Sequence, residues 1–489
     1  MIIGGTTAGR YAALTATSMR ASVALVEPQA NYSFTQQYAI SQLAYNMRFT
    51  NNTLLGVNTS LIGKIDRKDT GVLADMMLFA NQVVTHAEEQ NSPIILATKG
   101  VDIVYGNGQF QSSPHLGFAT SERLLKARTY LVATGSYCII PKIPGLLTAG
   151  FLTIENIWQY LYKKIGEQGI EFTSEKHKLP QNWVILGGSI QSVEIAQTLK
   201  HLGYKVTLIV PCTHIIPSLD LEIAFILQTQ LEAEGINILT KTQIIEVRCI
   251  DGQKCLHTGK QVIKTDEILV ATPSKPNIES LGLPKVGVKW HKYNQLKVNL
   301  KLQTNNRRIY ACGDVLGGFN CVNIANYEAK IAINNALFLP RLEVNYLNIP
   351  WAILTNPMVA QVGFIETLAK KQYCQEEFFV LRQFYKNLVK AQIQDETTGI
   401  CKLIVLRNGE IIGGSIFGSQ AGELINIITL AITHKIKINQ LADLYPIYPS
   451  FSEILQQISN LWQHLNFNNH IYWQEFLDDF FTFRRNWKI

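Results

Sequence analysis

Short apolar runs and amphipathic segments alternate along the chain in an order that occurs twice. Apolar residues 1–3 lead into the glycine-rich turn 4–9, a helical segment Arg10–Met19 and the apolar run Val23–Glu27. Residues 183–186 lead in the same way into the turn 187–192, a helix through His201 and the strand Lys205–Val210. A strand, a tight turn, a helix and a second strand make the first half of a Rossmann unit. The pattern therefore predicts an α/β chain with two Rossmann-like nucleotide-binding domains.

The pattern changes from Trp351 onward, where short strands alternate with turns and two helices follow. Strands are expected at 402–406 and 411–412 around Asn408-Gly409, and helices at 421–433 and 451–465. This favours an α+β domain. The expected boundaries are 1–150 with 273–345 for the first nucleotide domain, 151–272 for the second, 346–460 for the α+β domain and 461–489 for an aromatic tail.

Composition narrows the class of protein. The 489 residues are enough for about three domains. The net charge of +7 comes without a long basic run, which argues against nucleic acid as a partner. Eight cysteines form neither a disulfide framework nor a metal-binding pattern, so a reducing, cytoplasmic location without a metal is expected. Only three residues precede Gly4, which leaves open a true start upstream of Met1.

The first turn has the chemistry of a phosphate-binding loop. Gly4 and Gly9 fill the first and third glycine positions of a Rossmann turn, and Thr6 stands at the second. A helix begins just after this turn, and its free amides attract phosphate. Glu27 ends the next strand, where a carboxylate accepts hydrogen bonds from a ribose. A turn this degenerate is by itself also compatible with a purely structural role.

Further segments carry a resemblance that covers nearly the whole chain. They are 105–110, 131–136, 143–145, 151–153, 309–315, 356–357, 361–364 and 418–423. Together with the first turn they resemble the pyridine nucleotide-disulfide oxidoreductases, a family that includes dihydrolipoamide dehydrogenase, glutathione reductase and mercuric reductase. The resemblance implies FAD, a homodimer formed through the C-terminal domain, and a flavin ribityl chain that donates to Asp314. The implied FAD-binding residues are Gly4, Gly5, Thr6, Gly9, Glu27, Gly108, Ala133, Thr134, Gly135, Gly313, Asp314 and Ala325.

Both parts of the family's disulfide chemistry are missing. Its CxxxxC pair lies on the helix just after the ribose-binding acid, but residues 27–49 contain no cysteine. Its catalytic histidine comes from the partner subunit, and the matching position is Tyr448, while the glutamate that follows is kept as Glu453. Tyrosine is a poor acid-base group near neutral pH. The remaining thiols are expected to be inert, including Cys249 and Cys255, which we expect to face each other across a hairpin in the second domain.

The second turn departs further from the family pattern. Gly187 and Gly188 are kept, Ser189 and Ser192 replace later glycines, and Val210 stands where a ribose-binding acid is expected. Glu194 matches a glutamate that pairs in the family with a lysine near the flavin, but Arg48 is the nearby cation in this chain. NAD(P)H binding at Gly187, Gly188, Ser189 and Glu194 therefore competes with a purely structural role for this domain.

Two functions remain in view. The first is an FAD-dependent oxidoreductase, similar to diaphorases, that passes electrons from NAD(P)H directly to a quinone-like or other small acceptor. Its acceptor pocket would be shaped by Tyr32, Phe34, Gln36, Gln37 and Tyr38, whose alternative role is packing beside the flavin. The second is a non-catalytic, flavin-binding scaffold or redox-responsive protein.

The tail carries aromatic residues near helical spacing. They are Trp473, Phe476, Leu477, Phe480, Phe481 and Phe483, followed by Arg484, Arg485 and Lys488. Packing on the same subunit or across the dimer is favoured over a peripheral membrane contact, because Asp478 and Asp479 interrupt a cationic face.

Overall fold

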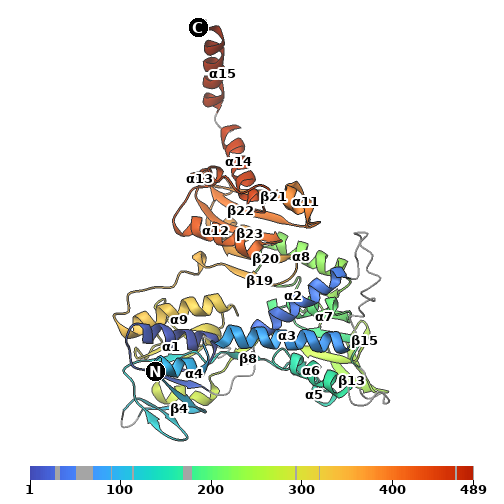
Figure 1. Cartoon of the computed structure of the whole chain (residues 1–489), viewed down its shortest axis with the longest axis vertical. Helices are drawn as coiled ribbons and strands as arrows, with labels where there is room; N and C mark the ends of the chain where they lie inside the picture. The colour runs from blue at the N-terminus through green and yellow to red at the C-terminus, as the bar shows by residue number, and fades with distance from the viewer. Residues whose placement is uncertain are drawn as a thin grey trace. The chain divides into compact units, whose positions relative to one another are not determined.

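A computed structural model describes the chain at residues 1–27, 34–50, 70–89, 91–112, 115–168, 179–291, 295–318, 320–468 and 471–487. The chain forms two compact units. One comprises Met1–Ile216 and Gln228–Val344, and the other comprises Pro217–Leu227 and Asn345–Ile489. Figure 1 colours the elements along the chain.

The first parallel sheet of the larger unit is built around the first glycine turn. Its strand order is β18 (Ile309–Ala311), β7 (Tyr130–Val132), β1 (Ile2–Ile3), β2 (Val23–Glu27) and β3 (Val101–Tyr105). Small residues let α1 (Thr7–Ser18) and α9 (Val322–Leu337) pack together, with Ala12, Ala13 and Ala332 fully buried. The helix begins at Thr7 rather than at the predicted Arg10, because Thr6 caps it. Around this sheet lie α4 (Pro93–Thr98) and the meander β4 (Gly108–Gln111), β5 (Gly117–Thr120) and β6 (Leu124–Leu125).

A second parallel sheet repeats this plan. Its order is β12 (Asn237–Leu239), β11 (Lys205–Ile209), β10 (Asn182–Leu186), β16 (Glu267–Val270) and β9 (Leu152–Thr153). The other elements of this region are α2 (Phe34–Thr50), α3 (Thr70–Glu89), α5 (Leu146–Ala149), α6 (Ile157–Gln168), α7 (Ile190–His201), α8 (Leu221–Ala233), β8 (Ser136–Cys138) and β17 (Ser274–Pro276). Helix α2 packs against α7 and α3.

The cysteine hairpin of the second sheet region differs from its expected register. Strands β13 (Glu246–Ile250), β14 (Gln253–His257) and β15 (Val262–Thr265) form the expected antiparallel meander. Cys249 pairs with Lys254, however, and Cys255 pairs with Arg248. The expectation that the two thiols face each other is wrong, because Asp251 and Gly252 are the turn itself and the register is set one residue away. A one-residue shift reverses the face, so Cys255 is buried and Cys249 is exposed.

The smaller unit contains an antiparallel sheet covered by helices. Its order is β19 (Trp351–Ile353), β20 (Met358–Gly363), β23 (Ile411–Gly418), β22 (Ile400–Leu406) and β21 (Phe378–Phe384). Packed with it are α10 (Glu366–Gln372), α11 (Val389–Ile393), α12 (Ala421–Thr433), α13 (Ile438–Ala442) and α14 (Glu453–Asn468). With two parallel sheets and this α+β unit, the predicted fold class is confirmed.

Two features of the units differ from the domain boundaries expected from the sequence. Residues 217–227 group with the C-terminal unit, although they fall within the expected second nucleotide domain. Helix α14 crosses the expected boundary at 460, and Trp462 is buried in the core of this unit. The tail forms α15 (Ile471–Asn486). Within the described part of the chain, every helix is too short or too polar to cross a lipid bilayer.

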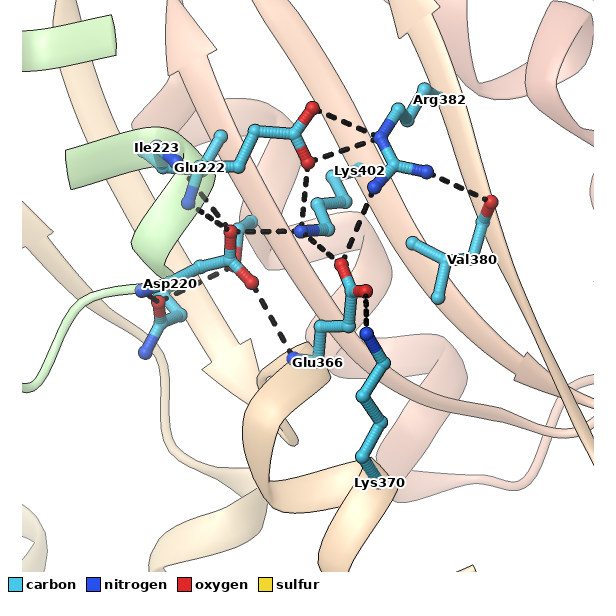
Figure 2. Close-up of polar contacts among 10 residues, drawn as sticks. Asp220, Glu222, Ile223, Glu366, Lys370, Val380, Arg382 and Lys402 are labelled. Carbon is cyan, nitrogen blue, oxygen red and sulfur yellow. Dashed lines mark hydrogen bonds and ion pairs between the residues drawn. The ribbon is translucent and has the colours of Figure 1, made fainter. Parts of the chain in front are cut away.

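Buried charges hold residues 217–227 to the sheet of the C-terminal unit (Figure 2). The Lys402 ammonium is 2% exposed, and its Nζ lies 2.9 Å from Asp220 Oδ1, 2.9 Å from Glu222 Oε2 and 2.7 Å from Glu366 Oε2. Arg382 binds Glu222 through Nε, at 2.9 and 3.0 Å from its two carboxylate oxygens. Lys370 contacts Glu366 on the exposed side. We call Asp220, Glu222, Glu366, Arg382 and Lys402 the ion cluster.

The ion cluster predicts a loss of stability in acid. Burial alone would raise the pKa of Glu366, but hydrogen bonds from Lys370 and Lys402 lower it to about 2, below its ordinary value of 4.5. A carboxyl with a lowered folded pKa stabilises the protein above its unfolded pKa, and this contribution is lost as the pH falls toward the folded pKa. The urea midpoint should therefore decrease between pH 4.5 and 2. Glu366→Gln should decrease less over this range, and an equal decrease would contradict the assignment.

Candidate functional site

The first glycine turn lies at the carboxyl end of β1, where ligands bind in sheets of this kind. Gly4 has a φ of 117°, and a Cβ there would collide with the Ala133 carbonyl. Its N–H donates to Val26 O at 2.8 Å. A Cβ at Gly5 would collide with the Glu27 side chain. The turn is thus tight because β2 and β7 approach it from both sides.

Thr6, at the second glycine position, stabilises this turn through two hydrogen bonds. Its hydroxyl accepts from the Gly9 N–H at 3.2 Å and donates to Ala133 O at 2.8 Å. The hydroxyl therefore caps α1 and ties the turn to the end of β7. A Cβ at Gly9 would collide with the Gly4 carbonyl, so the third position needs glycine for close packing of helix on turn.

Glu27 has one carboxylate oxygen engaged and one available. Its side chain is buried, and Oε1 pairs with Arg10 Nη2. Oε2 is buried and has no hydrogen-bond partner among the described residues. A buried acceptor without a partner is costly, and a ribose hydroxyl would satisfy it. Arg10 was missed in the sequence because nothing in the motif marks the residue after Gly9.

Apart from Gly108, the remaining expected FAD residues lie near the same edge of the first sheet. Ala133-Thr134-Gly135 follows β7, where Thr134 Oγ1 donates to Asn277 O at 2.6 Å. Gly313 follows β18, and its N–H donates to Glu328 at 2.6 Å. A Cβ at Gly313 would lie 3.4 Å from the Ala325 Cβ, so glycine lets the start of α9 approach. The residues that follow β1, β2, β7 and β18 thus lie together, because these four strands are neighbours in the sheet.

Asp314 supplies a second carboxylate, after Glu27, at the strand ends of the first sheet. Its Oδ2 accepts from Ser136 Oγ at 3.0 Å. Burial raises the pKa of Asp314, and the hydrogen bond from Ser136 offsets part of that rise.

Gly108, another expected FAD residue, has a different local role, because a Cβ there would collide with the Phe118 ring of the adjacent strand. In the same segment, Tyr105 pairs with Glu27 between strands β3 and β2, and the Gly106 N–H lies 3.2 Å from Glu27 O.

The second glycine turn repeats the backbone of the first with different side chains. Gly187 N–H donates to Ile209 O at 3.0 Å, as Gly4 N–H does to Val26 O. Ser189 caps α7 and donates to Ala271 O at 3.2 Å, as Thr6 does to Ala133 O. The residue beside Gly188 is Val210, whose Cγ1 would lie 2.7 Å from a Cβ at Gly188. Val210 therefore occupies the place that Glu27 has in the first turn.

Glu194 is a buried carboxylate on the helix that follows the second glycine turn. It is 3% exposed on α7. Burial, followed by the charges of Glu194 and Asp314, raises the pKa of Cys321 to about 12. Cys321 directly precedes α9. The side chain of Arg48, the cation considered for Glu194, lies outside the described residues.

The buried thiols have the chemistry of packing groups. Burial, followed by the charges of Glu328 and Asp314, raises the pKa of Cys312 well above its ordinary value. Burial also raises the pKa of Cys138 and brings that of Cys401 to about 12. A reactive cysteine needs a lowered pKa, so these thiols stay protonated. The described His, Cys, Asp and Glu side chains form no group suited to a metal ion.

Helix α2 carries two of the amide residues that were expected to shape an acceptor pocket. Gln37 is 3% exposed, and its Oε1 accepts from Trp158 Nε1 at 2.6 Å. Its Nε2 is a buried donor without a partner among the described residues. Gln36 Nε2 donates to Asn81 Oδ1 at 2.7 Å, and Tyr38 is half-buried. Of the other expected pocket residues, Tyr32 and the Phe34 side chain lie outside the described residues.

Tyr448 and Glu453 have separate surroundings in the C-terminal unit. Tyr448 is 70% exposed in the single chain, beside the exposed Tyr445 and Ile447. Glu453 Oε1 accepts from the Ser450 N–H at 2.7 Å at the start of α14. The glutamate thus binds the backbone of the loop that precedes its helix, and the tyrosine is exposed in that loop.

Comparisons with known proteins agree with this geometry. Residues 1–329 match the pyridine nucleotide-disulphide oxidoreductase family, and residues 349–458 match the dimerisation domain of that family. Mercuric reductase of Staphylococcus aureus is 29% identical over 83% of this chain and 70% of its own length. Dihydrolipoyl dehydrogenase of Acholeplasma laidlawii is 30% identical over 71% of this chain and 98% of its own length.

A solved structure shows the same fold. The HOCl-induced flavoprotein disulfide reductase RclA from Escherichia coli, as its Cu(II) complex, aligns with a TM-score of 0.78 and 22% identity, covering 94% of this chain and 98% of its own. Homologues in this family bind FAD and use NAD(P)H, in agreement with the cofactors expected from the sequence. The chain therefore belongs to the class I pyridine nucleotide-disulphide oxidoreductase family.

Proposed function

We propose that this chain is a homodimeric, FAD-dependent oxidoreductase that passes electrons from NAD(P)H to a quinone-like or other small acceptor without a redox disulfide. One combination of features carries the proposal. Apart from Gly108, the expected FAD-binding residues lie near the strand ends of the first sheet, and residues 27–49 contain no cysteine. FAD, when bound, supplies hydride acceptance and electron transfer. One NAD(P)H and one proton would convert one quinone to its hydroquinone, so no protein thiol is needed.

The residues of the first edge fit FAD. The amides after Gly4 and the start of α1 suit the pyrophosphate, and Glu27 Oε2 suits a ribose hydroxyl. Asp314 suits the ribityl hydroxyls, and the start of α9 suits the far end of the flavin. The unsatisfied Gln37 amide on α2 is a donor that a bound acceptor or the flavin would complete. Tyr445, Ile447 and Tyr448 form an exposed loop that the partner subunit would cover.

An absorption spectrum tests the proposal. The full chain, purified without added cofactor, should be yellow and should bleach within a turnover when NADH or NADPH is added anaerobically. A benzoquinone should then restore the colour, whereas glutathione disulfide and lipoamide should not. Reduction of either disulfide at a rate comparable to that of the quinone would overturn the claim that the chain is not a disulfide reductase.

The alternative is a flavin-binding scaffold with a decayed nicotinamide site. Val210 beside Gly188 and the Pro273 that follows Ala271-Thr272 favour it, because the second turn lacks the carboxylate of the first. A yellow protein whose spectrum is indifferent to both nucleotides would support this alternative and reject the enzyme.

Val210 gives a direct test of the second site. Because Val210 and Glu27 occupy equivalent places, Val210→Glu should fit and supply an acceptor for the adenosine ribose of NADH. A hydrogen bond to a charged group contributes about 1.5–3 kcal/mol, so the KM for NADH should fall about 10-fold. The KM for NADPH should not fall, because its 2′-phosphate meets the new carboxylate. Val210→Gln is the uncharged control, and equal changes for both nucleotides would contradict the prediction.

A further inference from the structure

Helix α15 carries a continuous stripe of exposed aromatic side chains. Phe476, Phe480 and Phe483 are 55%, 43% and 61% exposed, and Trp487 directly after the helix is 67% exposed. Their spacing alternates between four and three residues, which is the a/d spacing of a coiled-coil heptad. Trp473 extends the same spacing toward the N-terminus of the helix in the sequence. The stripe thus has the periodicity of a helix seam.

Such a helix needs a surface to pack on. Isolated helices of about this length are marginal in water, and most of their stability comes from packing one face. A contiguous set of exposed apolar side chains also marks an interaction site more often than a solvated surface. Phe481 of the same helix is 50% exposed as well, but it falls outside the four-three spacing. The question is which partner the stripe fits.

The charges beside the stripe select the partner. With Phe480 at an a position and Phe483 at a d position, Asp479 falls at g and Arg484 at e of the next heptad. In a parallel pair, each g residue faces the e residue five positions later on the other helix. Asp479 would therefore meet Arg484 of a second copy on both sides of the seam. In an antiparallel pair g positions face g positions instead, so Asp479 would not meet Arg484.

We propose that α15 pairs with α15 of a second copy as a parallel, two-stranded coiled coil with an aromatic seam. The dimerisation-domain match ends at residue 458 inside α14, and α15 follows that helix. Dimerisation there would hold the two seams at an effective concentration in the millimolar range. An anionic membrane fits less well, because Glu475, Asp478 and Asp479 accompany the stripe.

Cysteine cross-linking of the full chain tests this pairing. Phe483→Cys places a thiol in the seam, and Phe481→Cys places one on the same helix but off the stripe. Under mild oxidation, Phe483→Cys should give a covalent dimer on a non-reducing gel. Phe481→Cys should give no more than the wild-type background from the exposed Cys212, Cys249 and Cys374. Equal cross-linking of the two variants would overturn the proposal.

A charge exchange tests the orientation. In the Phe483→Cys background, Asp479→Arg or Arg484→Asp should each reduce cross-linking, and the two together should restore it.

Flotation with vesicles of phosphatidylcholine and phosphatidylserine should leave the chain unbound, and binding that replaces cross-linking would overturn the pairing. Light scattering separates this inference from the proposed homodimer: a dimer without the Phe483 cross-link rejects only the coiled coil, and a monomer rejects both.

Discussion

Replacing Lys402 by methionine is expected to lower the free energy of unfolding by about 3–5 kcal/mol. The ammonium is 2% exposed and lies within 3 Å of three carboxylates. Methionine keeps the apolar stem but leaves Asp220, itself 2% exposed, with only backbone donors at Glu222, Ile223 and Glu366 among the described residues. An uncompensated buried carboxylate is the source of the loss. Urea denaturation of the full chain at pH 7 would measure it.

The same substitution at Lys370 is the matched control. Lys370 also contacts Glu366, at 2.7 Å, but it is 53% exposed, so Lys370→Met should change stability by no more than about 1 kcal/mol. Adding Asp220→Asn to Lys402→Met should recover part of the loss, because the orphaned charge is removed. Equal effects of Lys402→Met and Lys370→Met would show that the ion cluster contributes little.

The ion cluster also shows what the sequence could not predict. Asp220, Glu366 and Lys402 are far apart in the chain, and none lies in a motif or at a periodic position. Glu366 and Lys402 lie in the expected C-terminal domain, whereas the sequence placed Asp220 in the second nucleotide domain. Asp220 meets them because residues 217–227 group with the C-terminal unit. The sequence around each residue gives no sign of a long-range ion pair, whereas a glycine turn is recognisable from its own local sequence.

The glycine turn after β1 could be predicted because backbone geometry restricts residue type there. Gly4, Gly5 and Gly9 are required by close approaches of neighbouring groups, and Thr6 is explained by its capping hydroxyl. The bounds of β2 and α12 match those expected, since apolar period and turn residues agree there. Arg10 and the Gln37–Trp158 contact were missed, because a side-chain pair depends on which helix faces which. The predicted pairing of Cys249 with Cys255 was wrong by one residue for a similar reason. Sequence spacing shows that two strands lie close together, but it does not fix which residues pair.

Gly4→Ala is expected to remove FAD from the purified protein. The added Cβ would collide with the Ala133 backbone, and the φ of 117° is one that alanine rarely adopts. Neither β1 nor β7 can move without disturbing the sheet, so the turn itself must shift by enough to displace the pyrophosphate. Overpacking of this kind costs about 1–3 kcal/mol or more, which corresponds to a loss of roughly 10- to 100-fold in FAD affinity. The ratio of flavin to protein absorbance measures the change.

Two matched glycines separate the causes of that loss. Gly100 has a φ of 88°, but a Cβ at this position would meet no heavy atom of the described residues within 4 Å, so Gly100→Ala tests backbone strain alone and should stay yellow. Gly187 has a φ of 142° and meets the Ala271 carbonyl as Gly4 meets Ala133, so Gly187→Ala tests the same collision in the second turn. It should retain FAD and lose only its response to NAD(P)H. If Gly4→Ala folds with the thermal midpoint of Gly100→Ala and keeps its flavin, the first turn does not hold the cofactor.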